Sequence, residues 1–119
     1  MDFEFIFRDT KNGTAALLAD RTGRLADVDD TIDLMGNASF SGADRLILFS
    51  DQLPDSFTEL RTGVAGEILQ KFSNYRMKLA IIGDFTENGS KALRDFIRES
   101  NRTGHILFVG TMEEAIEQL

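Results

Sequence analysis

Residues 45–49, Arg-Leu-Ile-Leu-Phe, form a short and almost wholly apolar run that decides the fold class. Such a run is typical of a strand in a parallel sheet whose two faces are both covered by other elements. The same pattern returns at residues 79–82, Leu-Ala-Ile-Ile, and at residues 106–109, Ile-Leu-Phe-Val. We therefore expect three mutually parallel buried strands within one sheet.

The segments around these runs carry apolar residues at helical spacing. Between the first two runs, one apolar stripe is formed by Leu60, Val64, Ile68, Phe72 and Tyr75. A second helix is expected around Leu93, Phe96 and Ile97, which alternate with charged neighbours. After the third run, Thr111 and Glu114 have the spacing of a capping box and predict a final helix.

The N-terminal segment predicts a hairpin. Residues 3–7, Phe-Glu-Phe-Ile-Phe, are rich in strand-forming residues. Asn12-Gly13 is a strong hairpin signal, so residues 14–19 are expected to return antiparallel to the first strand.

A helix is expected from Asp27 to Asn37, with Asp27 as its cap and Gly36 and Gly42 around its end. The whole chain then reads β-β-α-β-α-β-α-β-α. This order predicts an α/β fold with a mostly parallel sheet and an antiparallel N-terminal hairpin at its edge.

Composition limits the possible functions of the chain. Its 119 residues include one Pro and no linker or repeat, so we expect one domain over residues 1–119. The formal charge of −7 disfavours sequence-independent nucleic-acid binding, which needs Lys and Arg. Absence of Cys excludes disulfides and thiolate catalysis. No apolar run suits a membrane span and Met1 to Glu4 is unlike a signal peptide, so a cytoplasmic protein is expected.

Ligands of parallel sheets bind beyond the carboxyl ends of the strands. Asp51 and Asp84 follow two of the apolar runs and could together hold a hard cation such as Mg²⁺. We favour the simpler interpretation that both cap turns, because no third ligand is evident. The single His105 stands at a strand start, where a structural role is expected. No catalytic residue, metal or cofactor is therefore assigned.

Residues 61–66, Arg-Thr-Gly-Val-Ala-Gly, contain two glycines, each of which costs about 1 kcal/mol inside a helix relative to Ala. One interpretation is that a helix begins here, with the Thr62 hydroxyl exposed near its N-terminus. The other is that Ser56 and Glu59 form a capping box that starts the helix earlier. Gly66 would then be a packing contact.

The sequence also resembles two known families. Residues 42–44, 60–72, 74–85 and 93–101 are similar to a bacterial family of small proteins, described as a domain of unknown function, over nearly the whole chain. More loosely, the element order and the closing stretch Thr111 to Ile116 resemble the STAS domain of sulphate transporters and anti-sigma factor antagonists. That second resemblance implies a STAS-like fold and a non-enzymatic regulatory role.

The STAS signature is Asp-Ser-Ser-Gly, and a partner kinase phosphorylates its second Ser. The matching residues here are Leu60, Arg61, Thr62 and Gly63, with Thr62 at the phosphorylated position. Leu60 and Arg61 depart from the signature. This resemblance and the two glycines of the turn together predict a surface for another protein at Arg61, Thr62, Gly63 and Gly66. The alternative is a module that binds a small ligand or anion at the strand ends around Asp51 and Asp84 and at the turn of residues 62–66. A third, less favoured hypothesis is a metal-dependent hydrolase that uses Asp51 and Asp84. The oligomeric state is left open.

Overall fold

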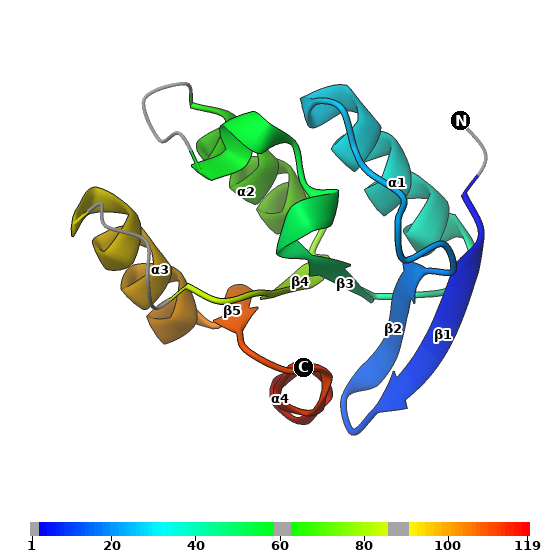
Figure 1. Cartoon of the computed structure of the whole chain (residues 1–119). Coiled ribbons are helices and arrows are strands. Elements are labelled where there is room, and N and C mark those ends of the chain that lie inside the picture. The colour runs from blue at the N-terminus through cyan, green and yellow to red at the C-terminus, as the bar shows by residue number, and fades with distance from the viewer. Residues whose placement is uncertain (1–2, 59–62, 86–90) are drawn as a thin grey trace.

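A computed structural model describes residues 3–58, 63–85 and 91–119 of the chain. These residues form an α/β fold with a mixed five-stranded sheet (Figure 1). The strands are β1 (Phe5–Thr10), β2 (Gly13–Leu18), β3 (Arg45–Phe49), β4 (Lys78–Ile82) and β5 (Ile106–Val109). The α-helices of the described part are α1 (Val28–Phe40), α2 (Val64–Asn74), α3 (Lys91–Thr103) and α4 (Met112–Gln118).

The strands lie in the sheet in the order in which they occur along the chain. β1 pairs with β2 antiparallel, and β2, β3, β4 and β5 pair in parallel. The prediction that the three apolar runs are mutually parallel is confirmed, as is the antiparallel hairpin at the edge. Strand ends also coincide, because Phe49 at the end of β3 pairs with Ile82 at the end of β4.

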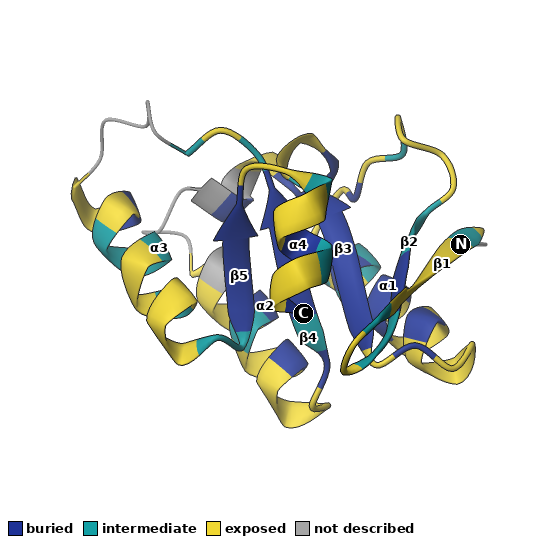
Figure 2. Ribbon diagram, turned by 90° about the horizontal axis from the view of Figure 1, so that it is seen from below, coloured by how far each residue is buried: buried dark blue, intermediate teal, exposed yellow. Residues whose placement is uncertain are grey.

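Helices cover both faces of the sheet, and they do so unequally. α1, α2 and α3 lie on one face, as expected when successive crossovers step in one direction, and α4 lies on the other (Figure 1). Successive residues of each central strand pack on opposite faces of the sheet. Leu46 and Leu48 pack towards the three helices, and Ile47 packs towards α4. Figure 2 shows α4 over buried strands, with its outer surface exposed.

The C-terminal helix is held by polar as well as apolar contacts. Ala115 and Leu119 are fully buried against the sheet. The buried Arg45 donates from Nε to the Leu119 carbonyl at 2.7 Å, and Asn12 Nδ2 donates to the same oxygen at 3.1 Å. The prediction that Thr111 caps this helix is confirmed, because its side chain accepts a hydrogen bond from the Glu114 N–H. None of the helices in the described ranges combines the length and apolar character that a membrane crossing requires.

Helix boundaries differ from the sequence expectation at two places, and at a third the structure decides between two alternatives. α1 continues through Gly36 to Phe40, since one glycine weakens a helix without ending it. α2 begins at Val64, as expected if a helix opens within residues 61–66, and not near Ser56, because residues Asp55–Thr58 form a separate 3₁₀ turn. Tyr75 is expected in the apolar stripe, but it follows the end of α2 and is 67% exposed.

Candidate ligand site at the carboxyl end of the sheet

A loop of residues 19–27 lies between β2 and α1, at the carboxyl end of the parallel strands. Gln52, which is 2% exposed, joins this loop to the end of β3. Its Oε1 accepts a hydrogen bond of 2.9 Å from the Phe49 N–H, and its Nε2 donates to the carbonyl of Arg21 at 3.2 Å. The Gln52 carbonyl accepts from the Leu25 N–H at 2.8 Å. The hydrogen bonds of Gln52 therefore hold this loop against the end of β3.

Two ion pairs join the same loop to the segment after β3. Arg21 reaches both carboxylate oxygens of Asp51, at 2.7 and 3.3 Å. Its guanidinium also lies over the ring of Phe49, with 3.6 Å between the guanidinium carbon and the ring centroid. Arg24 pairs with Asp55 at 2.7 Å. These contacts place two arginines and two carboxylates on the solvent side of the strand ends.

The pKa values of two carboxyl groups in this region are lowered. The pKa of Asp51 lies below its ordinary value chiefly because Arg21 donates hydrogen bonds to the carboxylate. The pKa of Asp20 is lowered because the hydroxyl and the N–H of Thr22 both donate to its Oδ1. Both carboxylates are exposed, so water screens these effects and both groups stay ionised at neutral pH.

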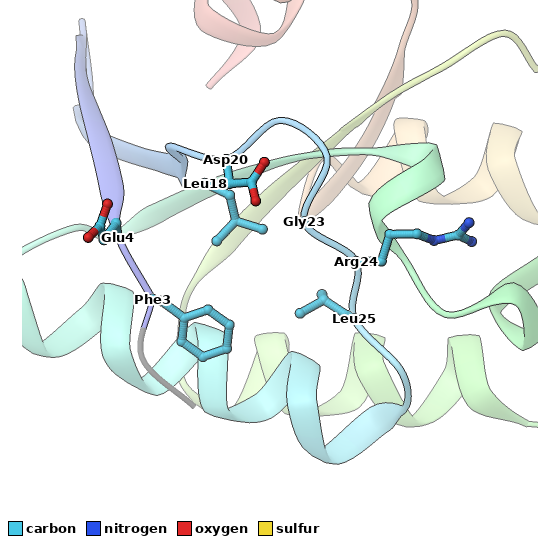
Figure 3. A pocket seen from close by; sticks show the side chains of 7 residues that line it. All are labelled: Phe3, Glu4, Leu18, Asp20, Gly23, Arg24 and Leu25. Carbon is cyan, nitrogen blue, oxygen red and sulfur yellow. The ribbon is translucent and has the colours of Figure 1, made fainter.

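Two pockets lie on either side of Arg24. The first, of about 340 Å³, has an apolar floor of Phe3, Leu18 and Leu25, and Glu4 and Asp20 also line it. In Figure 3 the three apolar side chains point towards one another, and Arg24 extends away from them.

The second pocket, of about 270 Å³, opens between the ends of β3 and β4. Its floor contains Phe57, Ile81 and Phe85, and its polar lining contains Arg24, Ser50, Asp51 and Asp55. Below this floor the rings of Phe57 and Phe85 both pack on Phe108, with centroids 6.3 and 5.1 Å away. A pocket with an apolar floor and a charged rim suits a small molecule that carries both kinds of group.

Asp51 and Asp84 follow neighbouring strands, as the sequence suggests, but they are placed differently. Asp51 lines the second pocket and is held by Arg21. Asp84 is exposed and follows Gly83, outside the described lining of that pocket. A Cβ on Gly83 would lie 2.6 Å from Ser50 Oγ, so the two strand ends approach too closely for a larger residue. In the described ranges no three His, Cys, Asp or Glu residues group as metal ligands would.

The glycine-rich turn opens α2. Gly63 precedes the helix with φ of 76°, a conformation that favours glycine. Gly66 lies in the first turn of the helix and is exposed, and a Cβ built there meets none of the described residues within 4 Å. Arg61 and Thr62 lie outside the described residues. The described part of the chain gives no packing partner for Gly66, and the two interpretations of this glycine stay predictions.

Sequence reasoning missed Arg21 and Arg24 as members of this region; it placed Gln52 at the end of the strand but did not predict its hydrogen bonds to the loop. The available signal is the polar stretch Asp20 to Arg24, directly after β2. If β2 is considered only as the second strand of the hairpin, the residues after it look like an ordinary surface loop. Because β2 also pairs in parallel with β3, the end of β2 lies at the same edge of the sheet as the end of β3. His105 lies at the opposite end, before β5, and its buried Nε2 has no hydrogen-bond partner in the described part of the chain.

These features define a small α/β domain with an ion-paired loop above the carboxyl end of its sheet. The chain belongs to the family described as a domain of unknown function (DUF4180), whose model matches residues 10–119. Comparison with curated proteins and comparison with solved structures each gave no match.

Proposed function

We propose that this chain is a bacterial, cytoplasmic, STAS-like regulatory module that binds another protein through residues 61–66. The observation that carries the proposal is Gly66. A glycine in the first turn of α2 weakens the helix, yet none of the described residues lies within 4 Å of the position where its Cβ would be. Packing among the described residues gives no reason for that glycine, whereas close approach of a partner does.

The architecture fits such a module. Its sheet has five strands, and the closing helix α4 starts with an acidic first turn, Glu113 and Glu114. Gly63 precedes α2 with a φ of 76°. Thr62 comes two positions before the first residue of that helix in the sequence, and a phosphate near the N-terminal end of a helix is tolerated because this end favours negative charge.

The test uses the wild-type chain, Gly66→Gln and Thr62→Glu as baits in a lysate of the source organism. Ala92→Gln serves as the matched control, since Ala92 is also a small, exposed helical residue and lies on α3. We expect a protein that wild type and Ala92→Gln retain and that Gly66→Gln loses. Thr62→Glu should change its capture. Identical capture by all four baits would contradict the proposal.

A second candidate function is binding of a small ligand or anion at the strand ends. The pocket of about 270 Å³ between β3 and β4 favours it, because parallel sheets bind ligands at this edge. Arg24 and Ser50 on its rim could hold an anionic group, and Phe57 and Phe85 an apolar one. Thermal-shift screening of small carboxylates and phosphates tests it. A ligand that stabilises the wild type and fails with Arg24→Gln would support it; the absence of any such ligand would contradict it.

A further inference from the structure

Two large side chains that a small protein would normally bury are exposed on the layer of three helices. Phe40, the last residue of α1, is 95% exposed, and Tyr75, directly after α2, is 67% exposed. α1 and α2 run side by side on the same face of the sheet (Figure 1). A groove of about 530 Å³ lies between these two aromatic residues, lined by α1 residues from Ile32 to Phe40 and by Tyr75.

Gly36 forms part of this groove, and no described residue packs where its side chain would be. It lies in the middle of α1, where glycine weakens a helix relative to alanine. It is exposed, it has no positive φ, and a Cβ built on it meets none of the described residues within 4 Å. Neither the backbone conformation nor packing among the described residues therefore requires a glycine there. A glycine does allow the backbone of another molecule to lie directly on α1.

The charges around the groove indicate which kind of molecule would bind there. Among the described residues that line it, Asp33 alone is charged. α1 contains Asp29, Asp30 and Asp33 and no basic residue. Asp33 is exposed and forms no ion pair within the described ranges. A second copy of this chain would bring the same acidic surface against itself, and each copy already carries a net charge of −7. The charge complementarity favours a basic partner.

We propose that the groove between Phe40 and Tyr75 binds a basic amphipathic helix of a partner protein. Apolar residues of that helix, one turn apart, would pack on Phe40 and Tyr75, and its backbone would cross Gly36. Lys or Arg residues on its flank would face Asp33 and Asp29. In such interfaces, large aromatic side chains that lie beside small residues contribute much of the binding energy. The described lining of this groove contains none of residues 61–66, so the proposal does not rest on the proposed function.

The test pans a displayed library of random peptides of about 16 residues, long enough for about four helical turns, on the wild-type chain. We expect enriched peptides with net positive charge and apolar residues spaced three and four apart. Synthetic copies of them should bind at least about tenfold more weakly to Gly36→Gln and to Phe40→Ser. Asp33→Asn should weaken binding further than Glu117→Gln, which removes the same charge from α4.

A crossed control separates this groove from the turn at residues 61–66. Gly66→Gln should bind the enriched peptides as the wild type does, while circular dichroism shows that Gly36→Gln keeps its helix content. Failure of the library to enrich any peptide family would overturn the proposal, and so would peptides that bind Gly36→Gln unchanged. A concentration-dependent dimer of the wild type that Gly36→Gln abolishes would overturn it as well, in favour of a second copy.

Discussion

Arg45 Nε donates a hydrogen bond of 2.7 Å to the backbone carbonyl of Leu119, 74 positions later in the chain. Arg45 is only 7% exposed, and its second polar contact is an ion pair with Asp44 at 3.1 Å. The bond joins the first residue of β3 to the residue after α4. It is a buried, charge-assisted link between the sheet and the only helix on that face within the described residues.

Replacement of Arg45 by Met should therefore loosen α4. The variant keeps much of the side-chain volume and removes the donor, so we expect a loss of about 1–3 kcal/mol in the free energy of unfolding. Urea denaturation measures it. Arg98→Met, on the exposed surface of α3, is the matched control and should leave the unfolding midpoint nearly unchanged. Equal midpoints for the two variants would show that the Arg45 hydrogen bond does not contribute to the free energy of unfolding.

Gln52→Leu should destabilise the loop of residues 19–27. The change leaves the partly buried N–H of Phe49 and the carbonyl of Arg21 without their present partner, which costs about 1–3 kcal/mol. Hydrogen exchange should become faster at Leu25, whose N–H donates to the Gln52 carbonyl. Gln118→Leu on exposed α4 serves as control. Unchanged exchange at Leu25 would mean that the loop is held independently of this side chain.

The two glycines at the start of α2 should respond oppositely to alanine. Gly66→Ala should raise the free energy of unfolding by about 0.5–1 kcal/mol, because the added Cβ meets open space and alanine favours the helix. Gly63→Ala should lower it by about 1–2 kcal/mol, because its φ of 76° is unfavourable for a residue with a Cβ. Thermal unfolding measures both. A destabilised Gly66→Ala would support the packing interpretation.

Acidification should weaken the contact between Arg21 and Asp51. The pKa of Asp51 is lowered in the folded chain, so its contribution to stability is present above the unfolded pKa. That contribution is lost as the pH falls through the folded pKa. Arg21→Gln should move the Asp51 pKa back towards its ordinary value and flatten this part of the stability profile. NMR titration of the carboxyl carbon measures the pKa, with Arg8→Gln as control.

Magnesium and manganese should find no saturable site at Asp51 and Asp84. The Asp51 carboxylate already receives two hydrogen bonds from Arg21, and a metal would have to displace them. Isothermal titration of the chain with either ion should give only heats of dilution. A micromolar site that disappears in Asp84→Asn would establish the two-carboxylate interpretation instead.

The sheet could be predicted from the sequence because its central strands are apolar on both faces. Leu46, Ile47 and Leu48 leave no polar side for solvent, so a covered parallel strand is the simplest arrangement. The end of α2 is not predictable in the same way. Tyr75 continues the apolar spacing of Ile68 and Phe72, but the helix ends one residue before it, and hydropathy carries no information about that step.

The candidate site was predictable only in part. Asp51 stands where parallel strands place their ligands, and it does line a pocket there. Its partner Arg21 lies 30 positions earlier, in a loop whose position depends on the parallel pairing of β2 with β3. No local sequence pattern predicts an ion pair between residues so far apart in the chain. The amide network of Gln52 is equally long-range, and in sequence it looks like one more polar residue of a turn.

The chain-order arrangement of the strands has a consequence for how the molecule is made. Each parallel strand pairs with the strand before it, so a growing chain always adds to an edge that has already been synthesised. Pairings of this kind close modest loops and avoid a long search. The bonds from Asn12 and Arg45 to Leu119 are different, because their acceptor arrives more than seventy positions after Arg45. We expect assembly to proceed outward from the hairpin, strand by strand, and these two bonds to close last, as α4 docks on a sheet that is already built.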